Sequence, residues 1–255
     1  MATKNFNVDP QYYDLQVDWK KRMEKERVFF ENIFKSRKIS RVLDIGCGTG
    51  HHAELFAEYA REVVAIDPDP EMIDYVESNI IKSKNITLHR AGFEELDRIP
   101  DGKFDLITSI GNTLPLLGDR KKIKQALKKI RGRLSENGIV VLQFLNFSSK
   151  IIDKNNYYPP KVFKKDGFTY IFIKHFQYGK QKTRLDLIIT GLDGSSVKEF
   201  HVNSSYLATL KVNIFKSMAV NSGFKKIELI GPGGIDRFDP GKHISLYALL
   251  TRKES

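Results

Sequence analysis

The chain of 255 residues is long enough for one sizeable α/β domain with an insertion, or for two small domains. Hydrophobic residues make up 41% of it and aromatic residues 11%, which is typical of a globular protein with a substantial core. Its single cysteine, Cys47, excludes a disulfide framework and a cysteine-rich zinc site, and no apolar run approaches the length of a membrane span. Because the N-terminus also lacks a signal-peptide pattern, we expect a cytoplasmic protein.

The net charge of +11 raises the alternative of an RNA or membrane-surface partner. The lysines are spread over many segments, which favours a solvated surface over a binding patch. Basic residues do gather on one face of a helix predicted over 119–134, but this helix is expected on the back of the sheet. RNA therefore remains an alternative partner and is not the favoured one.

Residues 12–36 form the first predicted element, a helix with an apolar face. Its apolar residues recur at helical spacing: Trp19, Met23, Phe30, Ile33 and Phe34. We expect this amphipathic helix to cover an edge of the sheet, within an N-terminal cap of residues 1–40.

The stretch from Arg41 to Gly50 is a short apolar run that breaks into alternating glycines before a helix predicted over 51–60. Strand, glycine turn and helix form a nucleotide-binding crevice at the carboxyl end of a first strand. Asp44 lies at the end of that strand, where its carboxylate would repel a pyrophosphate but suits an ammonium group. S-adenosylmethionine carries such a group, with an adenosine and a sulfonium but no phosphate, and glycines let the backbone approach it closely.

Residues 42–50, with the sequence VLDIGCGTG, resemble the first motif of the class I S-adenosylmethionine-dependent methyltransferases. The resemblance implies S-adenosylmethionine as the cofactor and S-adenosylhomocysteine as its product. It implies an α/β fold, a Rossmann-like doubly wound seven-stranded sheet with an antiparallel last strand. It also implies a set of cofactor-binding residues in the motif: Asp44, Gly46, Cys47, Gly48 and Gly50.

The second predicted strand, residues 62–67, ends in Asp67, which follows Gly46 by 21 residues. Doubly wound folds place an acid here on the ribose hydroxyls. We therefore expect Asp67 to bind the ribose of the cofactor.

Three further residues are implied to lie near the adenine ring. Met72 belongs to the helix that follows Asp67, and enzymes of this family commonly touch the adenine edge from this point. Gly92 and Phe93 follow a third strand predicted over 86–90, beside which the family places the ring. Ordinary core roles for Met72 and Phe93 stay open.

A fourth strand, predicted over 104–110, leads into Gly111-Asn112-Thr113 at the place where the transferred methyl group should emerge. Enzymes of the family that methylate exocyclic amines of nucleic acids carry Asn/Asp/Ser-Pro-Pro-aromatic here, and this chain does not. The run from Ile110 to Thr113 instead resembles the Leu-Gly-Asn-Ser of glycine and sarcosine N-methyltransferases, where the Asn helps to bind the substrate. The resemblance makes Asn112 the leading substrate residue and Ile110 a cofactor contact, with a local turn as the alternative for Asn112.

The N-terminal cap resembles the same branch, in which a Tyr, a Trp and an Arg close over the ligands. By this resemblance, Tyr12, next to Tyr13, would contact the substrate, and Trp19 and Arg22 the cofactor. The alternative is that they only cover the sheet edge. Both descriptions can hold at once.

A fifth strand is predicted over 139–145, after a turn at Asn137-Gly138. Asn146, at its end, is a further substrate candidate. The glycine N-methyltransferase branch has an Arg near this point that holds the substrate carboxylate, and Leu145 stands there instead. An amino-acid carboxylate would lack its bidentate partner, so we expect a larger, less acidic acceptor.

Residues 150–206 are too long for an ordinary connection and alternate in polarity. Their aromatic residues occur at every second position over much of the stretch: Phe168, Tyr170, Phe172, Phe176 and Tyr178. This pattern predicts an inserted antiparallel β flap, at the point where the branch places its substrate-covering subdomain. Methyl transfer gains from exact positioning in a dry pocket, which a flap supplies.

A helix predicted over 207–222 and strands over 226–230 and 243–251 match the terminal hairpin of the family. The predicted domains are thus the cap, a Rossmann-like methyltransferase domain of residues 41–149 and 207–255, and the insertion at 150–206. We expect methylation of a small molecule, at nitrogen of an amine first and at oxygen second. RNA methylation and a non-catalytic binding module remain alternatives.

No residue is identified as catalytic, because an amine acceptor needs only to be deprotonated. His175, His201 or Tyr206 would be able to assist, and each is equally plausible as a structural residue. No metal-ligand spacing is recognisable. A homo-oligomer is left open.

Overall fold

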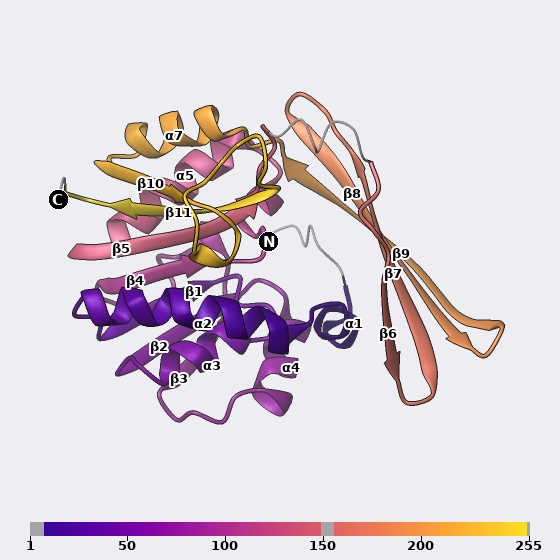
Figure 1. Ribbon diagram of the computed structural model, residues 1–255. Coiled ribbons are helices and arrows are strands. Elements are labelled where there is room, and N and C mark those ends of the chain that lie inside the picture. The colour runs from indigo at the N-terminus through magenta and orange to yellow at the C-terminus, as the bar shows by residue number, and fades with distance from the viewer. Residues whose placement is uncertain (1–7, 149–155, 254–255) are drawn as a thin grey trace.

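A computed structural model describes residues 8–148 and 156–253. Residues 1–7 of the predicted cap and the predicted start of the insertion at 150 lie outside the described residues. The described chain forms two sheets (Figure 1), a seven-stranded one of order β10-β11-β5-β4-β1-β2-β3 and a four-stranded one of order β6-β7-β8-β9.

The larger sheet has a parallel centre and an antiparallel strand near one edge. Its parallel neighbours are β1 (Arg41–Ile45), β2 (Glu62–Asp67), β3 (Ile86–Arg90), β4 (Phe104–Ser109) and β5 (Leu134–Leu145). The last strand, β11 (Ser245–Thr251), runs antiparallel to both β5 and β10 (Lys226–Ile230). The predicted fold class is confirmed.

Helices cover both faces of this sheet, which is why its central strands are almost wholly apolar. On one face, residues such as Leu43 of β1 pack with α5 (Arg120–Arg133) and α7 (Val212–Asn221). On the other, Val42 packs in a cluster with α2 (Trp19–Ser36), α3 (His51–Ala57) and α4 (Pro70–Asn79). The carboxyl ends of β1, β2 and β4 are left for loops.

The four-stranded sheet is a twisted antiparallel ribbon that projects from the main domain (Figure 1). It consists of β6 (Lys161–Lys165), β7 (Phe168–Gln177), β8 (Lys182–Asp193) and β9 (Ser196–Ala208). The short helix α1 (Pro10–Leu15) lies between this ribbon and the main domain. The predicted antiparallel flap is therefore present.

The prediction of one continuous helix over 12–36 is wrong, because the chain breaks between α1 and α2. Asp18 is the cause: its side chain accepts a hydrogen bond from the backbone N–H of Lys21 (3.1 Å) and starts a new helix. Asp9 caps α1 in the same way, through the N–H of Gln11 (2.8 Å). Each helix thus has its own start signal.

Three other predicted boundaries are also wrong. The expected turn at Asn137-Gly138 lies inside β5, which begins at Leu134 and shifts its register against β4. The helix expected from Leu207 begins only at Val212, because Leu207 pairs with Thr183 as part of β9 and is fully buried there. The last strand begins at Ser245 instead of His243.

No helix in the described ranges is both long and apolar enough to cross a membrane.

Candidate functional site

The glycine loop, residues 46–50, follows β1. All three of its glycines adopt left-handed conformations, with φ of 69° at Gly46, 54° at Gly48 and 78° at Gly50. The N–H of Gly46 donates to the carbonyl of Ile66 (2.8 Å), which ties the loop to the end of β2. A Cβ at Gly46 would collide with the side chain of Thr113, in the loop after β4. The carboxyl ends of β1, β2 and β4 therefore converge on one place. We call it the cradle: the glycine loop of residues 46–50, the end of β2 and the loop after β4.

Asp44 lies at the end of β1, with 2% of its surface exposed. The hydroxyl of Thr108 donates to its Oδ1 over 2.7 Å. Burial raises the pKa of the Asp44 carboxyl, and the charge of His52, the Thr108 hydrogen bond and the charge of Arg22 partly oppose it. The acid is thus held in place behind the glycine loop.

Asp67 lies at the end of β2 and is tied to the same loop. Its Oδ2 accepts a hydrogen bond from the N–H of Gly48 (3.0 Å) and its Oδ1 one from the N–H of Asp69 (2.9 Å). Burial raises the pKa of Asp67 to about 6, although these two backbone hydrogen bonds lower it, and the charges of Asp69 and Asp44 add to the rise. Both predicted acids are therefore at the cradle.

The predicted adenine neighbours Met72, Gly92 and Phe93 follow β2 and β3, and Ile110, a further predicted cofactor contact, follows β4. Met72, Phe93 and Ile110 are each more than nine-tenths buried. Phe93 belongs to the large core cluster, so its placement suits the core role that the sequence left open. At Gly92 a Cβ would be in ordinary contact with Pro68, 3.5 Å away.

Helix α1 lies over the glycine loop through Tyr13. A Cβ at Gly48 would lie 3.4 Å from the Tyr13 ring, and one at Gly111 would lie 3.3 Å from its hydroxyl. Tyr13 therefore spans the loops after β1 and β4. Burial raises the pKa of its hydroxyl, which stays protonated.

Tyr12, the predicted substrate residue, points the other way. Its hydroxyl donates to Glu199 of β9 and lies 3.5 Å from His201 Nε2. Its ring lies 5.9 Å from that of Tyr170 on β7. Of the two adjacent tyrosines, Tyr12 packs on the four-stranded sheet and Tyr13 faces the glycine loop.

Trp19 and Arg22 meet the start of α3, immediately after the glycine loop. The Trp19 ring stacks on His51 at 4.1 Å between centroids, and the Arg22 guanidinium lies 5.1 Å from the Trp19 centroid. His51 Nε2 lies 2.7 Å from Asp14 Oδ1. The structure brings these predicted cap residues to the edge of the cradle, with side chains from three helices.

A buried ionic network under α2 was not predicted from the sequence. Glu26 accepts hydrogen bonds from Arg22 Nε (3.0 Å) and the Tyr247 hydroxyl and lies 2.6 Å from His52 Nε2. Burial alone would raise the pKa of Glu26, but His52 and Arg22 hold it at about 2. The one available signal was an acid at helical spacing on the apolar face of α2.

Asn112 has a left-handed backbone, with φ of 69°. Its N–H donates to the carbonyl of Gln143 (3.1 Å), and its Oδ1 accepts from the N–H of Leu145 (3.0 Å). The side-chain oxygen is therefore used to join the loop after β4 to the end of β5.

The structure contradicts a substrate role for Asn146. The residue is fully buried, and its Nδ2 donates to the carbonyls of Pro240 (3.0 Å) and His243 (2.8 Å). Its Oδ1 accepts from the N–H of Ser148 (3.1 Å). Asn146 instead anchors the loop that precedes β11 to the end of β5.

Two of the three side chains considered for proton transfer lie on the outer face of the four-stranded sheet. His175 Nδ1 lies 3.2 Å from Asp186, its cross-strand neighbour, and Tyr206 is exposed on the same face. His201 lies beside Tyr12. Among the described residues, no group of three His, Cys, Asp or Glu side chains is arranged to hold a metal ion.

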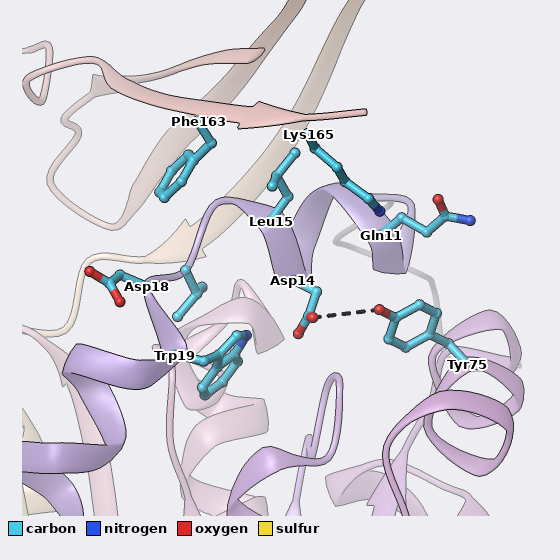
Figure 2. Close-up of a pocket in the computed structure, with 9 residues that line it drawn as sticks. Gln11, Asp14, Leu15, Asp18, Trp19, Tyr75, Phe163 and Lys165 are labelled. Atoms are coloured by element: carbon cyan, nitrogen blue, oxygen red, sulfur yellow. Dashed lines mark hydrogen bonds between the residues drawn. The ribbon is translucent and has the colours of Figure 1, made fainter. Parts of the chain in front are cut away.

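A cavity of about 570 Å³ opens beside α1, between the start of α2, α4 and β6 (Figure 2). Asp14 points into it and accepts a hydrogen bond from Tyr75 of α4 (3.5 Å). Phe163 and Lys165 of β6 close the other side. Its lining includes Asp14 and Trp19, which lie at the edge of the cradle, and no residue of the glycine loop.

Comparison with known proteins shows which family contains a segment like the one that forms the cradle. Residues 42–138 match a family described as a methyltransferase domain, and this segment contains the glycine loop, both acids and the loop after β4. The chain carries a class I S-adenosylmethionine-dependent methyltransferase domain. The predicted resemblance is thereby confirmed.

Curated relatives of this methyltransferase match part of the chain. A glycine/sarcosine/dimethylglycine N-methyltransferase of Actinopolyspora halophila is 30% identical over 153 residues, 57% of this chain and 27% of that protein. A glycine/sarcosine N-methyltransferase of Parasynechococcus marenigrum is 29% identical over 136 residues, 53% of this chain and 48% of that protein. The chain thus spans about half or less of the length of these curated relatives.

Solved structures match the whole fold of the methyltransferase. DesVI of Streptomyces venezuelae superposes with a TM-score of 0.78 at 19% identity, covering 97% of this chain and 100% of DesVI. CalS10, an amino pentose methyltransferase from Micromonospora echinaspora solved with S-adenosylmethionine bound, gives 0.76 at 19% identity, covering 97% and 98%. At these identities the likeness shows the fold, the four-stranded sheet included.

Proposed function

We propose that the protein transfers the methyl group of S-adenosylmethionine to a small-molecule amine. The observation that carries the proposal is the cradle of left-handed glycines, flanked by Asp44 and Asp67 and covered by Tyr13. The names of curated relatives, which are N-methyltransferases of glycine and sarcosine, support an amine acceptor.

The residues of the cradle fit the cofactor. Gly46, Gly48 and Gly50 have left-handed backbones and no Cβ, so a ligand can approach the main chain of this loop closely. Asp67 presents a carboxylate suited to two ribose hydroxyls, and Asp44 stands at the place of the amino-acid tail. When bound, S-adenosylmethionine supplies a methyl group activated by its sulfonium.

The chain's own contribution is binding, orientation and exclusion of water. We assign the adenine side to Met72, Gly92 and Phe93, a further cofactor contact to Ile110, and the cover of the cradle to α1 with Trp19 and Arg22 behind it. The acceptor would lie under the four-stranded sheet, next to the NH2 group of Asn112. In-line transfer depends mainly on such positioning.

Two of the three side chains considered for proton transfer lie on the outer face of the four-stranded sheet, which favours nitrogen over oxygen as the acceptor atom. His175 and Tyr206 face away from the main domain, and His201 is next to Tyr12. A hydroxyl acceptor needs a base to remove its proton, whereas an amine that is already neutral does not. An amine therefore suits the site better.

A small acceptor also suits the charge distribution better than RNA does. Helix α5 carries the strongest basic face, but Lys122 pairs with Glu94 (2.9 Å) and Lys129 with Asp97 (2.9 Å). Part of its charge is therefore neutralised on the protein, and α5 lies on a face of the sheet, away from the strand ends.

The test is transfer of label from methyl-labelled S-adenosylmethionine into a cell extract separated into small-molecule, RNA and protein fractions. We expect label in the small-molecule fraction, and its loss with the Asp67→Ala variant. Label in RNA would overturn the proposed acceptor class. No transfer, together with no binding of S-adenosylhomocysteine by calorimetry, would overturn the proposed activity itself.

A further inference from the structure

Lys174 interrupts the buried aromatic face of β7. Phe172 and Phe176 lie two residues away on either side, on the same face of the strand, and each is only 2% exposed. The cross-strand neighbour of Lys174 on β8 is Leu187, which is 1% exposed. A lysine in such a row is unusual, because burying an ammonium group costs free energy unless it has a partner.

The neighbours of the two phenylalanines place Lys174 next to the proposed active site. Phe172 packs in a cluster that includes Tyr13 of α1, the residue over the glycine loop. Phe176 belongs to the main core cluster, which also contains Leu114, two residues beyond Asn112. Lys174 therefore lies on the inner face of the sheet, between the cap and the loop after β4.

Two further cations reach the same place. Lys161 of β6 stands opposite Phe172, hence on the same face, and its Nζ donates to the carbonyl of Gln16 (3.1 Å), between α1 and α2. Arg22 lies in the first turn of α2. Burial first, and then the charges of Lys161 and Arg22, lower the pKa of Lys174 to about 8, as expected for three neighbouring cations.

The three cations are not fully neutralised by the protein. Arg22 is paired with Glu26, and Asp18 is near Lys161. Within residues 8–148 and 156–253, no carboxylate forms an ion pair with Lys174. Like charges held together in a partly buried place repel each other, and proteins retain such sets chiefly where a ligand compensates them.

We infer that Lys174 and Lys161 form an anion site for the methyl acceptor, which would carry a carboxylate or phosphate besides its amine. The inference rests on the proposed methyl transfer and names the substrate class of that same site. It revises the expectation of a less acidic acceptor that followed from Leu145. The charge that an Arg would supply after β5 comes instead from the inner face of the four-stranded sheet.

The first test compares pairs of amines that differ only by an acidic group: ethanolamine phosphate with ethanolamine, glycine with glycinamide, and glucosamine 6-phosphate with glucosamine. We expect at least one acid-bearing member to show a kcat/KM about 10-fold or more above its partner, as loss of one charge-assisted contact predicts. Lys174→Met should raise the KM for that acid-bearing amine and bring the ratio of the two kcat/KM values near one. Lys198→Met, an exposed lysine of β9, is the matched control.

The second test does not depend on turnover. The protein, saturated with S-adenosylhomocysteine, is acylated with a limiting amount of acetic anhydride in inorganic phosphate or in chloride of equal ionic strength, and each lysine is followed by mass spectrometry. We expect phosphate to slow acylation of Lys174 and Lys161 several-fold and to leave Lys198 unchanged. The anion site would be overturned if Lys174 and Lys161 were acylated at the same rate in phosphate as in chloride. It would also be overturned if the preference for the acid-bearing amine survived Lys174→Met. S-adenosylhomocysteine binding is measured separately by calorimetry. It decides whether the methyltransferase proposal stands if the anion site is overturned.

Discussion

At the scale of single residues, the proposed ribose site at Asp67 predicts that cofactor binding depends on pH. Burial raises its pKa to about 6, well above the usual 3.8, with help from the charges of Asp69 and Asp44. In the unliganded protein the ionised carboxylate therefore lowers stability, and this loss sets in as the pH rises from about 4 to 6. Ribose hydroxyls donate most strongly to the ionised form, so a ligand offsets the loss.

We therefore predict that the affinity for S-adenosylhomocysteine rises between pH 5 and pH 7, by up to about 10-fold for each pH unit below the pKa of Asp67. Isothermal titration calorimetry across this range measures it. In Asp67→Asn, which keeps the shape of the side chain, affinity should be lower and nearly flat with pH. A slope of equal size in both proteins would assign it to another group, such as Asp44, and remove Asp67 from the ribose site.

The charge of Glu26 stabilises the contacts between α2, α3 and β11. Its pKa of about 2 lies below the usual 4.5, so its contribution to stability is complete above pH 4.5 and is lost as the pH falls toward 2. Glu26→Gln should cost about 3–5 kcal/mol at neutral pH, because Arg22 and His52 would be left buried without a carboxylate. Urea unfolding at pH 7 and in acid measures both effects.

The matched control is Glu24→Gln, an exposed acid on the same helix, which should change stability by less than about 0.5 kcal/mol. If the two variants unfolded alike at pH 7, the network that joins α2, α3 and β11 would have no net stabilising role.

At the scale of elements, the glycine loop shows how closely β1 and β4 depend on each other. The left-handed backbone of Gly46 would cost about 1–2 kcal/mol with any Cβ, and that Cβ would also meet the side chain of Thr113. We predict that Gly46→Ala lowers the free energy of unfolding by more than this strain alone. Combining it with Thr113→Ser, which removes the Cγ2 atom and keeps the hydroxyl that bonds the carbonyl of Ile110, should recover part of the loss in urea unfolding. No recovery would mean that backbone strain is the whole effect.

The elements that the sequence predicted well are those set by local pattern. The strands over 62–67, 86–90 and 226–230 are found with the bounds expected. The first has an apolar run and the other two alternate apolar with polar residues, each between clear breaks. The elements that it missed are set by tertiary contacts. A turn at Asn137-Gly138 is the local preference, yet β5 includes these residues, because β4 pairs with β5 on both sides of them, at Leu134 and at Ile139.

The candidate site divides in the same way. Asp44 and Asp67 follow from a contiguous motif and its spacing, so the sequence sufficed to bring them together. Tyr12 and Tyr13 are adjacent on a short helix, and only the position of α1 decides which one faces the glycine loop. Lys174 was hidden for a related reason: it is the gap in the aromatic alternation of β7, and its partners come from β6 and α2.

At the scale of the whole molecule, α1 is the joint between the two sheets. It has six residues, too few to be stable as an isolated helix, so contacts fix its position. Tyr13 contacts the loops after β1 and β4, Asp14 contacts α3 and α4, and Tyr12 contacts β9. The cradle and the four-stranded sheet are thus linked through one short segment whose stability depends on both.

This arrangement predicts that a ligand bound in the cradle also protects part of the four-stranded sheet from hydrogen exchange. Binding stabilises the folded state by mass action, and the gain is largest where local opening would release the ligand. In hydrogen exchange with mass spectrometry, S-adenosylhomocysteine should slow exchange about 10-fold or more in the glycine loop and in α1, and to a smaller extent in β7 near Phe172. The hairpin tip between β8 and β9, which is distant from α1 in Figure 1, should not change. Tyr12→Ala, which removes the contacts with Glu199 of β9 and with Tyr170 of β7, should keep protection of α1 and reduce that of β7. Protection confined to the glycine loop in the wild-type protein would show that α1 does not couple the sheets, and that the acceptor site forms independently of the cofactor.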